Sequence, residues 1–177
     1  MSAARAREYT QGLQSGAEAA SSKFFDDQVK REESMNDEIL RRHGKENPYQ
    51  IWEELGEIMT ENVTVVRENK KLQTVDAKLV ALMARLKNIN SNDVSKWANQ
   101  SLVFTRQLGN MLELARLITK GALARNESRG AHYKPEFPNR DDANWLKTTV
   151  AKYTVNGPEL FYEPVDTSLL KPRERKY

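Results

Sequence analysis

The chain has 177 residues, enough for one domain with its own hydrophobic core, and contains no cysteine, which excludes disulfides, cysteine-ligated iron-sulfur clusters and thiol catalysis within it. Charged residues make up 30% and the mean hydropathy is -0.76, which favours a helix-rich chain. The net charge of +3 comes from interspersed basic and acidic residues, so we expect no nucleic-acid partner. No apolar run approaches about 18 residues and no signal-like stretch opens the chain, so we expect neither membrane insertion nor secretion.

The first predicted element is a polar helix over residues 23–40. Its apolar positions are sparse. We expect one narrow buried edge formed by Phe25, Val29 and Ile39. Gly44 is predicted to close the helix in the C′ position.

Two amphipathic helices are predicted next. Asn47 and Pro48 combine an N-cap residue with proline at the first helical position. Apolar residues then recur at steps of three or four, which is the helical period. In the first helix they are Trp52, Leu55, Met59, Val63 and Val66, and in the second Leu72, Val75, Leu79, Leu82 and Leu86.

The longest predicted helix runs from about residue 99 to residue 125. We expect its heptad-like apolar row to face the core of a helical bundle. That row is Phe104, Leu108, Met111, Ala115, Ile118 and Ala122. Three further leucines widen the apolar surface, which suits a helix with neighbours on two sides.

Prolines and glycines interrupt the chain after Gly130. A short helical turn is predicted over residues 141–146. Residues 148–153 and 160–163 are rich in β-branched and aromatic side chains and predict a small hairpin, which needs another surface for stability. The predicted fold is mainly α: an antiparallel three- to four-helix bundle of the up-down, spectrin-repeat-like kind, then an extended C-terminal segment with the hairpin.

An ordered series of short motifs follows the long helix. It reads Glu127-Ser128-Arg129-Gly130-Ala131-His132, then Pro138-Asn139-Arg140-Asp141-Asp142, then Trp145-Leu146-Lys147. The series resembles the C-terminal signature of the succinate dehydrogenase and fumarate reductase flavoprotein subunit. Residues 62–67 and 104–108 are similar to the Gram-positive type, and residues 161–165 and 175–177 to the family's strand pair and terminus. L-aspartate oxidase resembles the chain at the first motif, but the later motifs favour the former family.

The resemblance implies a subunit with covalently held FAD that oxidises succinate to fumarate and passes electrons to an iron-sulfur subunit. It implies a complex that is peripheral on the cytoplasmic face of a bacterial membrane. In the family, the catalytic and flavin-binding groups lie in the flavin-binding and capping domains, and the eight glycines here never form the G-x-G-x-x-G fingerprint. We therefore assign no catalytic, cofactor-binding or metal residue to this chain.

We expect the chain to be a fragment of that subunit. Residues 1–17 would be a remnant of the final helix of the flavin domain, with Met1 as a new start. Residues 18–130 would form the helical bundle, and residues 131–177 the extended segment with short strands.

Five residues of the signature are predicted to hold this region together or to contact the flavin-binding domain: Glu127, Arg129, His132, Arg140 and Trp145. Other roles stay open. His132 could act as a base or ligand, and Glu127 with Arg129 could bind a substrate carboxylate. The acidic pair after Arg140 could suggest a cation site, but an aspartate that starts a helical turn needs no metal.

Two functions follow. The first is the C-terminal helical domain of the flavoprotein subunit, which buttresses the flavin-binding domain of the same polypeptide and the interface with the iron-sulfur subunit. The second is a stand-alone helical scaffold or assembly protein. For the basic end at residues 171–176, docking on a partner subunit is favoured over contact with phosphate or acidic lipid.

Overall fold

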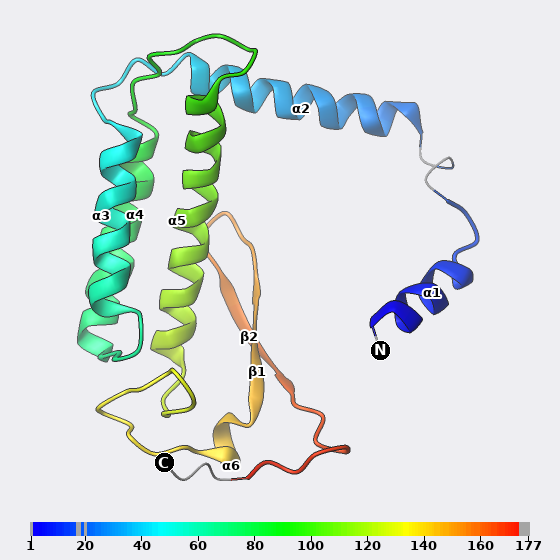
Figure 1. Cartoon of the computed structure of the whole chain (residues 1–177), viewed down its shortest axis with the longest axis vertical. Helices are drawn as coiled ribbons and strands as arrows, with labels where there is room; N and C mark the ends of the chain where they lie inside the picture. Colours follow the sequence, from blue (N-terminus) through cyan, green and yellow to red (C-terminus); the bar gives the residue numbers. More distant parts are fainter. Residues whose placement is uncertain (1, 17–18, 20, 174–177) are drawn as a thin grey trace. The chain divides into compact units, whose positions relative to one another are not determined.

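The computed structural model describes residues 2–16, 19 and 21–173 and divides into two units between Arg41 and Arg42. The first unit contains the helices α1 (Ser2–Gly12) and α2 (Ser22–Leu40). The second contains the other described helices and strands (Figure 1). Ser21 caps α2, because its side-chain oxygen accepts a hydrogen bond from the backbone N–H of Phe24 at 3.3 Å.

The predicted helix over residues 23–40 is confirmed, but its predicted buried edge is wrong in two of three positions. Phe25 is 50% exposed and Val29 is 56% exposed, whereas Ile39 is buried. The reason is that every residue of α2 from Ser22 to Met35 is exposed, so no apolar edge is covered along this part of the helix.

Gly44 does not close α2, because the helix ends at Leu40 with Arg41 as its cap. Glycine is needed at position 44 for a different reason. A Cβ atom there would lie 1.8 Å from the carbonyl oxygen of Asn88, and the Gly44 N–H donates to the carbonyl of Ile89 at 2.9 Å. The glycine therefore lets two backbone segments come into direct contact.

The helices α3 (Pro48–Asn62), α4 (Asn69–Leu86) and α5 (Gln100–Ala124) form an up-and-down bundle. α3 and α5 run in the same direction and α4 runs the opposite way (Figure 1). Asn47 caps α3 by accepting from the N–H of Tyr49 at 2.9 Å, and Asn99 caps α5 by accepting from Leu102 at 2.8 Å. The three predicted helices of this region are confirmed.

The bundle core is almost entirely aliphatic. α4 contributes the residues predicted from its spacing, Leu72, Val75, Leu79 and Leu82. α3 contributes Ile51 and Leu55, with Val63 just after the helix. Burial of one such side chain stabilises the fold by roughly 1.5 to 3 kcal/mol, so this core supplies most of the driving force.

The predicted buried rows of α3 and α5 are partly wrong. Trp52 is 46% exposed and Val66, beyond the end of α3, is 50% exposed. On α5, Met111 is 38% exposed and Ile118 is 46% exposed. Leu108, Ala115 and Ala122 are buried as predicted. The other three buried positions lie one residue further along, at Thr105, Leu112 and Thr119 in place of Phe104, Met111 and Ile118. A threonine fits there because its hydroxyl donates within the helix, from Thr119 to the Ala115 carbonyl at 2.8 Å.

The chain after α5 carries a short helix and a hairpin. α6 (Asp142–Trp145) is capped by Asp141, whose side chain accepts from the Asn144 N–H at 3.0 Å. β1 (Lys147–Lys152) pairs antiparallel with β2 (Glu159–Pro164), with Val150 opposite Phe161. The predicted turn and hairpin are confirmed, as is the mainly α fold class with a two-stranded sheet.

The hairpin tip lies against α5. Gly157 has a φ of 112°, and a Cβ atom there would lie 2.7 Å from a guanidinium nitrogen of Arg116 on α5. The positive φ requires glycine, whereas the end of the arginine side chain could move aside. The surface that a lone hairpin needs is thus provided by the bundle.

Candidate functional site

Glu127 is the centre of a polar cluster that begins where α5 ends. Its side chain is fully buried. It accepts two hydrogen bonds from Arg129, at 2.8 and 2.9 Å, one from Arg125, and one from the Asp141 backbone N–H at 3.1 Å. Burial alone would raise the pKa of Glu127, but these hydrogen bonds outweigh it, so the pKa lies below its ordinary value. The carboxylate is charged, and both of its oxygens accept hydrogen bonds from groups of the chain itself.

Arg125 joins this cluster to the hairpin. Besides Glu127, its guanidinium donates to the carbonyl oxygens of Trp145 at 3.0 Å and Lys147 at 2.5 Å, and to the Thr149 hydroxyl at 3.3 Å. It also lies 5.3 Å from the centre of the Trp145 ring. One side chain thus ties the end of α5 to α6 and β1.

His132 connects the cluster to the loop between α3 and α4. Its Nδ1 lies 2.7 Å from the Arg67 guanidinium, and its Nε2 lies 3.1 Å from the Arg125 carbonyl oxygen. Arginine can only donate and a carbonyl can only accept, so the ring is neutral with its proton on Nε2. Burial, with the nearby cations, lowers its pKa. The lone pair that a general base would use is occupied.

Lys134 is fully buried in the same segment, and no carboxylate of the described residues is hydrogen-bonded to it. Its Nζ donates to the Leu123 carbonyl at 2.9 Å and to the Asn126 side-chain oxygen at 3.1 Å. Burial lowers its pKa to about 8. The ammonium group satisfies a carbonyl at the C-terminal end of α5, where a positive charge is favourable.

The segment after α5 also docks on the α3–α4 loop through the backbone. The Tyr133 N–H donates to the Val65 carbonyl at 3.0 Å, and the Arg67 N–H donates to the Tyr133 carbonyl at 2.8 Å. Glu136 accepts from the Asn69 N–H at 2.7 Å and so caps α4. The cluster therefore joins three connections at one end of the bundle.

The acidic pair after Arg140 is engaged by protein donors. Asp142 accepts from Arg129 at 2.6 Å and from the Arg140 Nε at 2.6 Å, and these hydrogen bonds lower its pKa. Asp141 caps α6. Among the described residues, no group of three or more histidine and carboxylate side chains is arranged to hold a metal ion.

Trp145 is half-buried and ends α6, just before β1. Its ring meets Tyr162 edge-on at 5.7 Å, and the Lys147 ammonium lies 4.6 Å from the Trp145 ring centre. The five predicted residues thus converge: Arg129 and Arg140 share Asp142, Glu127 pairs with Arg129, and His132 and Trp145 both contact Arg125.

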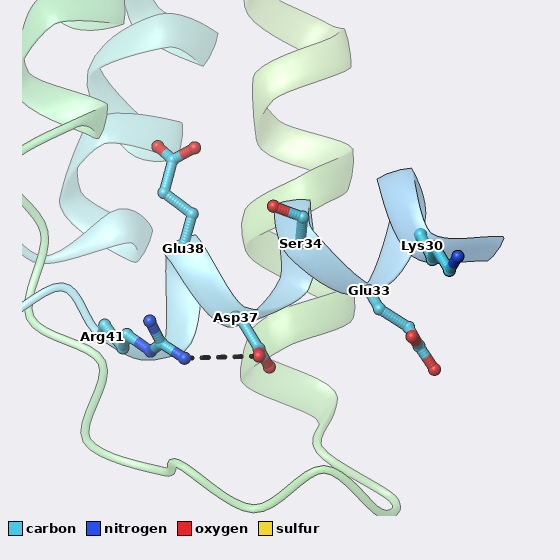
Figure 2. A pocket seen from close by; sticks show the side chains of 6 residues that line it. All are labelled: Lys30, Glu33, Ser34, Asp37, Glu38 and Arg41. Carbon is cyan, nitrogen blue, oxygen red and sulfur yellow. Dashed lines mark hydrogen bonds and ion pairs between the residues drawn. The ribbon is translucent and has the colours of Figure 1, made fainter. Parts of the chain in front are cut away.

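A second polar surface lies on α2 (Figure 2). It is lined by Lys30, Glu33, Ser34, Asp37, Glu38 and Arg41. Arg41 pairs with Asp37 across one helical turn at 3.5 Å. An exposed pair of this kind contributes at most about 1 kcal/mol, and nothing in the arrangement favours chemistry.

Sequence reasoning missed Arg67, Arg125 and Lys134. A lysine among prolines normally predicts a solvated side chain, and the two arginines lie outside the signature. Their partners are up to 65 positions away in the chain, as for Arg67 and His132. Arg67 ends a stretch, residues 62–67, that resembles the family, but the resemblance did not indicate its partner.

The family is decided by comparison with known proteins. The sequence model described as "Fumarate reductase flavoprotein C-term" matches residues 52–177. The chain belongs to this family. The succinate dehydrogenase flavoprotein subunit of Bacillus subtilis is 55% identical over 171 residues, which cover 96% of the chain and 29% of that subunit.

Other family members agree. The fumarate reductase flavoprotein subunit of Escherichia coli is 34% identical over 79% of the chain and 24% of that subunit. A solved structure of an E. coli quinol fumarate reductase variant has a TM-score of 0.82 at 31% identity, covering 88% of the chain and 27% of that protein. The chain thus spans less than a third of the relatives it matches.

The family is one of flavoproteins, and the described part of the chain contains no helix long and apolar enough to cross a membrane.

Proposed function

We propose that the chain serves as the C-terminal helical domain of a succinate dehydrogenase or fumarate reductase flavoprotein subunit. The parent subunit oxidises succinate to fumarate with FAD and passes electrons to an iron-sulfur subunit. The observation that carries the proposal is the family match over residues 52–177, together with 55% identity to the B. subtilis subunit.

The described residues do not fit FAD. The cations that could pair with its pyrophosphate, Arg125, Arg129 and Arg140, already pair with Glu127 and Asp142. The G-x-G-x-x-G fingerprint is absent from the sequence. We therefore place the flavin, and every reacting group, outside the described part of this chain.

The contribution of this domain is positional. The Glu127 cluster fixes the segment after α5 against the bundle, so that the whole second unit can act as a rigid support. We propose that it buttresses the flavin-binding domain of the same polypeptide and the interface with the iron-sulfur subunit, in a complex on the cytoplasmic face of a bacterial membrane. The interdomain role of Glu127, Arg129, His132, Arg140 and Trp145 stays a prediction.

A chimera tests the proposal. The part of the B. subtilis subunit that matches this chain is replaced by the chain, and flavin retention through gel filtration and succinate-dependent dye reduction are measured. We expect the chimera to retain flavin and to reduce the dye, and the same subunit truncated before the replaced part to lose both. A chimera that behaves like the truncated subunit would refute the proposal.

The isolated chain is the second arm of the same experiment. We expect it neither to retain FAD nor to oxidise succinate, because Arg125, Arg129 and Arg140 are paired internally and the G-x-G-x-x-G fingerprint is absent. Flavin absorbance that co-elutes with the isolated chain would contradict this prediction.

A further inference from the structure

One outer face of the bundle, along α3 and α5, is apolar. Phe104 of α5 stacks on Tyr49 of α3 at 4.4 Å and meets Trp52 edge-on at 6.4 Å. Further along, the Thr119 hydroxyl lies 3.9 Å from the Met59 sulfur. These contacts show that the two helices lie side by side and run parallel, with Tyr49 and Trp52 at the level of Phe104.

The apolar surface continues from this aromatic cluster along α5. Met111 and Ile118 follow Phe104 at steps of seven, so they lie on the same side of α5 as Phe104, which contacts α3. Both side chains are nevertheless partly exposed. Leu114 lies beside them and is also exposed. We call Tyr49, Trp52, Phe104, Met111, Leu114 and Ile118 the α3–α5 face.

α3 offers room for close approach at this face. A shallow hollow there is lined by Trp52, Gly56 and Thr60 and by three glutamates, Glu53, Glu57 and Glu61. A Cβ atom at Gly56 would meet nothing within 4 Å. A glycine within a helix costs about 1 kcal/mol relative to alanine, and at an exposed position nothing inside the bundle explains it.

We propose that the α3–α5 face is the surface on which the flavin-binding part of the subunit docks. The inference rests on the proposed function and assigns its contact surface. Exposed apolar patches of this kind mark interaction sites. The matched part is 29% of the B. subtilis subunit, so under the proposed function the tethered partner is much larger than this domain. A tethered partner meets the face at about millimolar effective concentration.

The charges on α3 disfavour a second copy of this chain as the occupant. Glu53, Glu57 and Glu61 recur every four residues beside the hollow, and none forms a salt bridge with another described residue. Two copies meeting through α3 would bring these carboxylates together, which is destabilising. The docking surface of the flavin-binding part should therefore be apolar with lysine or arginine at its border.

Cysteine labelling tests the assignment, because the chain has no cysteine of its own. Met111→Cys and Ile118→Cys place a thiol on the face. Val80→Cys is the matched control, since Val80 is a similarly exposed apolar residue on α4. The alkylation rate of each introduced thiol is measured by peptide mapping in the isolated chain and in the chimera with the B. subtilis subunit.

We expect the thiols at positions 111 and 118 to be alkylated at least about tenfold more slowly in the chimera than in the isolated chain, as for a desolvated interface centre. The thiol at position 80 should react at the same rate in both. A chimera that retains flavin while positions 111 and 118 stay fully reactive overturns the assigned surface and leaves the proposed function standing.

Two other outcomes also overturn the proposal. A chimera without flavin refutes the proposed function, and the surface assignment with it. If positions 111 and 118 are already protected in the isolated chain, and the protection weakens on dilution, the face is a contact between copies of this chain.

Discussion

The bundle core and the segment after α5 are stabilised in opposite ways. The core consists of aliphatic side chains such as Leu79 and Leu108, which are completely buried. Residues 125–146 contribute no apolar side chain to the buried core and are fixed by charged groups, with a buried glutamate and a buried lysine at their centre. Hydrophobic burial needs only area, whereas a charged cluster needs each partner in place. The two regions should therefore respond differently to substitution and to pH.

The largest effect is expected in the core. Leu108→Ala should lower the free energy of unfolding by about 2 to 5 kcal/mol, because it leaves a cavity in a fully packed site. Met111→Ala on the same helix should cost much less, since Met111 is 38% exposed. Urea unfolding of both variants measures the difference. Equal losses would mean that Met111 is buried like Leu108, as the sequence predicted.

Removal of the central carboxylate should have the next largest effect. Glu127→Gln should cost about 2 to 3 kcal/mol, because Arg125 and Arg129 lose their common counterion at a buried site. The pKa of Glu127 is lowered in the folded state, so its contribution is present above pH 4.5 and is lost as the pH falls below that value. Urea unfolding at neutral and acidic pH checks both points, with the exposed Glu61→Gln as control. If the difference in the free energy of unfolding between the wild-type chain and Glu127→Gln persisted at acidic pH, the charge-based explanation would be contradicted.

Lys134 should make the stability rise with pH. Its pKa falls from an ordinary value of 10.5 to about 8 on folding. Between these values the unfolded chain holds the proton that the folded chain has released, so the free energy of unfolding increases with pH, by at most about 1.4 kcal/mol per pH unit.

Lys134→Met should remove this rise, and Lys78→Met on the surface should keep it. Unfolding free energies measured between pH 8 and 10.5 provide the test. A wild-type profile that is flat or falling in this window would show that the buried lysine does not titrate there.

The smallest effects belong to the outer members of the cluster. Trp145 is half-buried, so Trp145→Ala should cost about 1 to 2 kcal/mol rather than the 3 to 5 of a fully buried tryptophan. Arg140→Ala should cost about 0 to 1 kcal/mol, because its pair with Asp142 is partly exposed. The loss of melting temperature in each variant, measured by thermal unfolding, tests this order. Equal and negligible shifts would mean that the segment is loose in the isolated chain.

Much of the fold could be predicted from the sequence, because local signals set the helices. Asn47-Pro48 and the spacing of the α4 leucines specify their elements without reference to the rest of the chain. The face of α5 could not be predicted. Leucine, methionine and isoleucine occur on all sides of α5, so two neighbouring rows of residues fit the same helical spacing. Only the positions of α3 and α4 decide whether Met111 or Leu112 is buried.

The candidate site was predictable only where a family resemblance marked it. The resemblance pointed to Glu127 and Arg129, but chemistry alone could not distinguish an internal ion pair from a substrate clamp. The contacts of Arg67 and Lys134 could not be predicted, because they form only when the segment after α5 folds back on the end of α5 and on the α3–α4 loop. The position of Gly44 was misleading, since a glycine soon after a helix normally predicts a helix cap rather than a close contact between two backbone segments.

The carboxylate of Glu136 caps the start of α4 from a distant part of the chain. The residue before α4, Glu68, makes no side-chain cap, and the first N–H of the helix is satisfied by a residue 67 positions later. This exposed hydrogen bond can form only when the segment after α5 is docked on the α3–α4 loop. The cap at the start of α4 therefore depends on a residue that follows the whole bundle in the sequence.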